Sequence, residues 1–152
     1  MAASDNVVRA GFTRKFCDRG TLGQMLTYRS TQREEQKMTP TIYSRCKFNS
    51  IADPSSTAVV YDPPIEEFAV ITTELSPIGS SVCFDAIEGP SIVICTGGVG
   101  TIKVGSKQEV MTEGTVVFVA ASMYCELESS AEGPFVTFRA FCETSSDVKA
   151  SS

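Results

Sequence analysis

The sequence predicts a mainly-β protein whose β-sheet domain occupies the second half of the chain. Short segments rich in Val, Ile, Thr and Phe, each about six residues long, recur from Ala58 to Phe141. Glycine-containing turns separate them roughly every 8–12 residues, which is typical of a sandwich or barrel. The chain has 152 residues, of which 42% are hydrophobic, so it is long enough for one domain with a real core.

Residues 18–28 predict a short helix, which Asp18 or Thr21 can cap at its start. Its apolar side chains recur at i, i+3 and i+4 and therefore share one face: Leu22, Met25 and Leu26. Residues 29–57 predict an irregular linker, because they are rich in charge and glutamine at first and then punctuated by prolines. Within the linker, 41–43 favours a short strand. Its length indicates that the linker packs over another surface.

From residue 58 onward, β-rich segments alternate with turns, and Asp62-Pro63-Pro64 ends the first strand. The predicted strands are 59–61, 68–73, 82–84, 91–96, 99–104, 108–111, 115–119, 124–127 and 135–141. The glycine-rich residues 96–100 could suggest a phosphate-binding loop. No helix and no G-K-S/T follow them, so a hairpin turn is the better interpretation. The whole pattern fits a cupin-like jelly-roll β-sandwich over 58–143, with a disordered tail over 144–152.

Composition excludes several classes of function. The net charge of −5 argues against general binding to nucleic acid or acidic membranes. The sequence has no run of 18 apolar residues and no basic-then-apolar leader, so we expect a cytoplasmic protein. It has no histidine, which removes the commonest general base and the commonest metal ligand.

The six cysteines are scattered, and no two form a C-x-x-C pair, so a four-cysteine zinc site is not indicated. Several lie among apolar strand residues, which predicts buried free thiols. They are Cys17, Cys46, Cys83, Cys95, Cys125 and Cys142. The adjacent carboxylates Glu34-Glu35 and Glu66-Glu67 do not converge on one site and predict solvated charge. Arg139, in the last strand, predicts a structural ion pair.

The stretch 4–16 contains the candidate chemistry of the chain. Arg9, Arg14 and Lys15 lie close to Gly11 and several polar residues. Guanidinium and ammonium groups suit phosphates and carboxylates, so the stretch could hold an anionic substrate. The alternative interpretation is ordinary surface charge.

The same stretch resembles a known signature. Ser-Asp-Asn-Val-Val-Arg-Ala-Gly at 4–11, followed by Phe-Thr-Arg-Lys-Phe at 12–16, is similar to the motif of type I mannose-6-phosphate isomerases, the zinc-dependent phosphomannose isomerases of fungi and animals. Residues 60–68 resemble the start of the family's last domain, and 89–92 and 138–142 also fit. The resemblance spans nearly the whole chain but only about the last third of a typical member. It implies that residues 1–28 are the end of a catalytic region.

The resemblance implies a reaction, the interconversion of mannose 6-phosphate and fructose 6-phosphate, which supplies GDP-mannose synthesis. Arg9 matches an active-site arginine, and Lys15 matches a lysine that would help bind the substrate phosphate. The family's zinc ligands are a glutamine, two histidines and a glutamate upstream of the motif, and none has a counterpart here. We therefore expect the chain alone to bind no zinc and to be inactive. Arg14 replaces the family's usual proline. The local backbone can therefore differ from that of the family, and the direction of the Lys15 side chain does not follow from the resemblance.

A second hypothesis belongs to another class of protein. The chain could be a non-catalytic β-sandwich module that binds a sugar phosphate or a partner protein. Binding of mannose 6-phosphate that is lost in Arg9→Ala would indicate that the chain keeps a substrate site. No binding at all would indicate an inert fragment.

Overall fold

The computed structural model describes residues 19–25, 30, 32–64 and 67–142. The chain divides into two compact units, Met1–Met38 and Thr39–Ser152. The first contains α1 (Arg19–Met25) and the 3-10 helix η1 (Arg33–Gln36), so the predicted helix is confirmed over seven residues. Neither described helix is long and apolar enough to span a bilayer. The predicted tail, 144–152, lies outside the described residues.

Glu34 and Glu35 lie in η1 and are exposed, as predicted for solvated charge. Glu34 Oε2 lies 2.7 Å from Lys37 Nζ, three residues along the chain. Both side chains of this pair are mostly exposed, so the ion pair adds little to stability. Glu67 is also exposed, whereas Glu66 lies outside the described residues.

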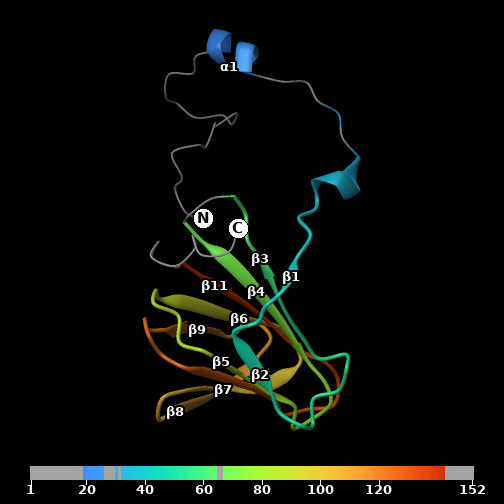
Figure 1. Cartoon of the computed structure of the whole chain (residues 1–152), viewed down its shortest axis with the longest axis vertical. Helices are drawn as coiled ribbons and strands as arrows, with labels where there is room; N and C mark the ends of the chain where they lie inside the picture. The colour runs from blue at the N-terminus through green and yellow to red at the C-terminus, as the bar shows by residue number, and fades with distance from the viewer. Residues whose placement is uncertain (1–18, 26–29, 31, 65–66, 143–152) are drawn as a thin grey trace. The chain divides into compact units, whose positions relative to one another are not determined.

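The second unit consists of two antiparallel sheets (Figure 1). The six-stranded sheet has the order β1 (Thr41–Ile42), β3 (Thr57–Tyr61), β4 (Ala69–Leu75), β11 (Phe135–Phe141), β6 (Ser91–Gly97) and β9 (Val116–Val119). The five-stranded sheet has the order β2 (Cys46–Phe48), β5 (Ser81–Phe84), β10 (Cys125–Ser129), β7 (Val99–Val104) and β8 (Lys107–Thr112). Neighbouring strands in both sheets are mostly distant in sequence, as in a jelly roll.

All nine strands predicted after residue 58 are confirmed. Within the predicted linker over 29–57, the short strand expected at 41–43 is present as β1, whereas β2 was not expected; the two strands join one sheet each. The β unit therefore begins before the boundary expected at residue 58. Strand β2 is only three residues long, too short for a period-two pattern, and it forms through pairing with β5, in which Cys46 lies opposite Phe84.

The glycine-rich residues 96–100 form a turn between β6 and β7, but the predicted hairpin is wrong, because β6 pairs with β11 and β9 in one sheet and β7 pairs with β10 and β8 in the other. Gly98, in this connection between the two sheets, has a φ of 76°, a left-handed conformation that glycine adopts at little cost. Gly105, with a φ of 59°, occupies the next turn, between β7 and β8. The phosphate-loop alternative is therefore wrong, since no helix follows this turn.

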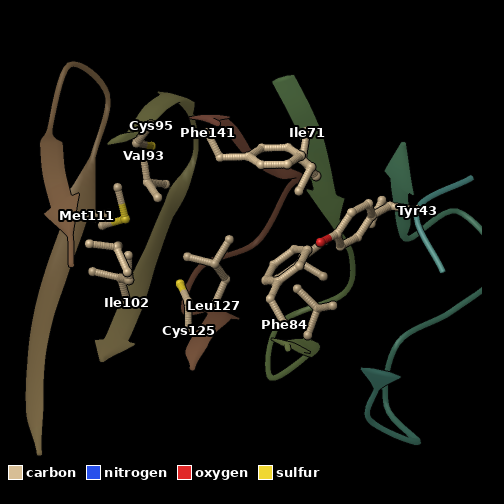
Figure 2. Packing of buried hydrophobic residues seen from close by; sticks show 14 of the residues in the cluster. Tyr43, Ile71, Phe84, Val93, Cys95, Ile102, Met111, Cys125, Leu127 and Phe141 are labelled. Carbon is tan, nitrogen blue, oxygen red and sulfur yellow. The ribbon is translucent and has the colours of Figure 1, made fainter. Parts of the chain in front are cut away.

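The core lies between the two sheets, where inward side chains of both meet (Figure 2). At one end, the Tyr43 ring packs on Phe84 and Phe141, with ring centroids 6.0 and 6.4 Å apart. Figure 2 shows Met111 and Ile102 at the other end, facing Val93. Burial of each such large side chain contributes roughly 1.5–3 kcal/mol to the free energy of unfolding. This shared interior fixes how the sheets face each other.

The two sheets approach each other closely at Gly100, and a substitution there tests this packing. A Cβ at this position would lie 2.5 Å from the carbonyl oxygen of Glu128 and 2.5 Å from the Phe135 ring. We expect Gly100→Ala to lower the free energy of unfolding by about 1–3 kcal/mol, because backbone and ring must move apart. Urea unfolding of the 152-residue chain would measure it. Gly97→Ala is the control, since its Cβ would make only ordinary contacts with Val136 at 3.9 Å. Equal losses in both variants would contradict the prediction.

Candidate functional site

Arg9 and Lys15, the residues predicted to carry the chemistry, lie outside the described residues, as do Gly11 and Arg14. Their roles therefore stay predictions. Within the described part of the chain, the candidate for chemistry is a polar group inside the sandwich, built around Arg139 of β11.

Strand alternation places Arg139 in the interior. Phe135, Thr137, Arg139 and Phe141 occupy every second position of β11, and all four are buried. Arg139 is 2% exposed and lies in register between Ile71 of β4 and Val93 of β6. A guanidinium is rarely buried to this extent unless it is paired.

The contacts of the Arg139 guanidinium come from two strands, one in each sheet. Its Nε donates a hydrogen bond of 3.0 Å to Ser91 Oγ, at the start of β6. Its Cζ lies 5.7 Å from the centroid of the Phe84 ring, on β5 of the opposite sheet, which is a cation–π distance. Its Nη1 is buried and has no hydrogen-bond partner among the described residues. The guanidinium is thus held by one hydrogen bond within its own sheet and reaches the opposite sheet through the Phe84 ring.

The predicted ion pair of Arg139 is wrong for the described residues, in which no carboxylate lies within salt-bridge distance of it. The physical reason is the register of the sheets. The inward neighbours of Arg139 on β4 and β6 are Ile71 and Val93, and the polar partner that reaches it is the hydroxyl of Ser91. A sequence signal for Ser91 existed, because it shares the inward parity of Val93 and Cys95 in β6.

Burial governs the protonation of this interior. Desolvation lowers the pKa of the Arg139 guanidinium, while Cys125 and Tyr43 oppose that change. Burial also raises the pKa of the Cys125 thiol to about 11, although Arg139 pulls it down. At neutral pH the interior therefore holds a cation and a protonated thiol.

This chemistry does not fit a zinc ion. A zinc site needs several deprotonated Cys, His or carboxylate ligands, whereas the Cys125 thiol stays protonated at neutral pH beside a buried cation. Across the described ranges, no three His, Cys, Asp or Glu residues are grouped so that they could hold a metal. What the interior offers chemically is a desolvated guanidinium on strand β11.

The predicted buried free thiols are confirmed at Cys95 and Cys125. Cys83 is also free but exposed, because it lies on the outward parity of β5, between the buried Val82 and Phe84. Cys46 and Cys142 are half-buried, and Cys17 lies outside the described residues.

Known proteins resemble both the sequence and the fold. Residues 58–107 match the family described as phosphomannose isomerase type I C-terminal. The mannose-6-phosphate isomerase of Aspergillus fumigatus is 54% identical over 144 residues, which cover 94% of this chain and 32% of that protein. That of Emericella nidulans is 50% identical over 149 residues with the same coverage. The chain thus spans about a third of the length of these relatives.

Solved structures match the architecture. The cupin domain of Cnp3 from Schizosaccharomyces pombe has a TM-score of 0.52 and 12% sequence identity, covering 62% of this chain and 66% of that one. At that identity the likeness shows the fold alone. The predicted cupin-like jelly-roll sandwich is confirmed.

Removing the Arg139 side chain should separate its charge from its volume. We expect Arg139→Met to leave the free energy of unfolding unchanged or higher, because an apolar chain of similar length avoids the desolvation of an unpaired cation. Arg139→Ala should cost about 3 kcal/mol, because it leaves a cavity. Denaturant unfolding of both variants measures this. A Met variant as unstable as the Ala variant would show that the guanidinium itself holds the sheets together.

The Cys125 thiol should make stability fall at high pH. Its pKa is about 11 in the folded chain against 9.0 for an unperturbed thiol, so the unfolded chain loses this proton first. The stabilisation is complete below pH 9 and is lost as pH rises through about 11, by roughly 2–3 kcal/mol. Unfolding between pH 8 and 11 measures the slope. Cys125→Ala, although less stable at every pH, should show a shallower decline; an unchanged slope would contradict the assignment.

Proposed function

We propose that this chain, a homologue of the C-terminal part of type I mannose-6-phosphate isomerases, contributes one wall of an active site that interconverts mannose 6-phosphate and fructose 6-phosphate. The observation that supports this most directly is the 54% identity to such an isomerase over 94% of the chain. Identity at that level extends well beyond the matched residues 58–107 and so includes sequence before the β sandwich.

The reaction sets the chemical demands on such a wall. An aldose becomes a ketose when a proton moves between C1 and C2 through an enediol-like intermediate. This step needs an electrophile for the developing oxyanion, a base, and an anchor for the phosphate. In this proposal the Arg9 guanidinium stabilises the oxyanion, and the Lys15 ammonium attracts the phosphate.

The zinc ion of the family needs ligands that these residues do not supply. The interior of the described sandwich does not fit zinc, and the sequence has no histidine. Zinc would therefore be held by the part of an isomerase that has no counterpart in these 152 residues. A polypeptide of these residues alone should not isomerise sugar phosphates.

The β sandwich has a supporting role in this proposal. Arg139, its one buried cation among the described residues, is 2% exposed and bonded to Ser91, so it does not meet a substrate. Sugar phosphates are the proposed partners, the product would feed GDP-mannose synthesis, and the proposed location is the cytoplasm.

A chimaera tests the assignment of Arg9. The C-terminal third of the Aspergillus fumigatus isomerase would be replaced by these 152 residues, and the chimaera should be active. Arg9→Ala should then lower kcat by about 10²–10³-fold, the usual cost of removing a group that stabilises an oxyanion. Arg14→Ala is the matched control and should change kcat little.

Two results would contradict the proposal in different ways. A folded but inactive chimaera would refute the isomerase assignment itself. An active chimaera in which Arg9→Ala and Arg14→Ala behave alike would refute only the role of Arg9. Calorimetry of the 152-residue chain with mannose 6-phosphate separates the remaining alternative, because binding that Arg9→Ala abolishes would indicate a sugar-phosphate-binding module.

A further inference from the structure

The outward side of the six-stranded sheet is apolar. We call its central part the outer apolar face, formed by side chains of β11, β6 and β9: Phe138, Ala140, Ile92, Ile94, Val116 and Phe118. All six are exposed, and Phe118 and Val116 are 68% and 58% exposed. Large contiguous apolar patches are uncommon on soluble monomers and mark interaction sites.

Strand register makes these residues neighbours. Ala140 lies opposite Ile92, which lies opposite Phe118. One step along the strands, Phe138 lies opposite Ile94, which lies opposite Val116. Two apolar rows therefore run across β11, β6 and β9, on the face of the sheet that points away from the core. Cross-strand neighbours in such rows touch, so the residues form one surface rather than scattered spots.

The other sheet of the same molecule provides a comparison. On the outward side of the five-stranded sheet, Lys103 lies opposite Glu126, and Glu126 lies opposite Cys83, which lies opposite Lys47. Glu128 of β10 has the same parity and is exposed. This sheet shows the usual arrangement of an antiparallel sheet, with one face on the core and one polar face in water. Of the two sheets, only the six-stranded one therefore has an apolar outward side among the described residues.

Sequence supports the same conclusion. Ile92-Val93-Ile94 in β6 and 116–119 in β9 are continuous apolar runs rather than alternating ones. Continuous runs are typical of strands that are buried on both sides. The inner side is covered by the five-stranded sheet, through Val93 and Val119. The outer side needs a second cover.

We infer that the outer apolar face is the surface against which the remainder of a type I mannose-6-phosphate isomerase packs. This inference rests on the proposed function. The relatives are about three times as long as this chain, which covers 32% of them, so a large body with no counterpart here remains to be placed. Interfaces that stay assembled resemble a domain core cut in half, which suits an apolar sheet face. The partner surface is accordingly apolar, and it excludes water from both rows.

A second copy of the chain fits the face less well. Each copy has a net charge of −5, so pairing two copies brings like charges together. Self-association through this face would instead appear as protection of the face in the 152-residue chain alone.

Two valines on edge strands make a matched pair for that test. Val116 lies in β9, on the outer apolar face, and is 58% exposed; Val110 lies in β8, in the other sheet, and is 65% exposed. Each would be changed to Lys, both in the 152-residue chain and in the chimaera with the Aspergillus fumigatus isomerase. In the 152-residue chain, neither change should shift the melting temperature appreciably, because both side chains face water. In the chimaera, Val116→Lys should lower it by about 4 °C or more, because a charge is forced into an apolar interface, while Val110→Lys should not.

A second measurement needs no substitution. Hydroxyl-radical oxidation followed by mass spectrometry reports the exposure of Phe118 directly. Phe118 should be oxidised in the 152-residue chain and protected in the chimaera. Protection already present in the 152-residue chain would mean that a second copy or residues 1–38 cover the face, and would overturn the inference. Equal melting temperatures for the two Lys variants in the chimaera would overturn it as well.

Failure of this inference can be told apart from failure of the proposed function. An active chimaera in which Phe118 stays oxidised refutes the interface and leaves the isomerase assignment intact. A folded, inactive chimaera in which Phe118 is protected and Val116→Lys is destabilising refutes the assignment while the interface stands.

Discussion

The space between the two sheets must be filled completely by their inward side chains, and the rest of the structure depends on this constraint. Strand β11 lies near the middle of the six-stranded sheet. Every second residue of it, from Phe135 to Phe141, points inward and helps to fill this space. A glycine is needed at position 100 because the Phe135 ring already occupies the place of its side chain. Arg139 follows the same alternation. Its guanidinium is therefore buried because of its position in the strand, and not because a carboxylate partner draws it inward.

The buried guanidinium shows how the interior treats polar groups. The hydroxyl of Ser91 and the ring of Phe84 satisfy it only in part, and Nη1 remains without a hydrogen bond among the described residues. An incompletely paired charge costs free energy, which the surrounding apolar burial must offset. The same desolvation keeps the Cys125 thiol protonated. An interior of this kind, with a buried cation and a protonated thiol, does not suit a metal ion.

The β sandwich was predictable from the sequence because each of its longer strands has its own pattern of β-branched and aromatic residues, bounded by glycine turns such as Gly98. Strand β2 was not, since three residues contain no period and its pairing with β5 is a long-range event. The surroundings of Arg139 were not predictable either. Strand alternation indicates which face of the sheet Arg139 lies on, but not its hydrogen-bond partner Ser91, which lies 48 residues earlier in the chain. Arg9 and Lys15 were reached only through a resemblance, because a few cations in a short stretch do not define a site.

The apolar runs in β6 and β9 illustrate a further limit of sequence reasoning. A run such as Ile92-Val93-Ile94 indicates burial on two sides but does not say what covers each side. Strand order settles one side, since Val93 faces the five-stranded sheet, and leaves Ile92 and Ile94 outward. A sheet with two apolar faces can stabilise its own domain with one face and bind a second body with the other. Changes on the inner face must then disturb both the domain and the assembly, whereas changes on the outer face should disturb the assembly alone.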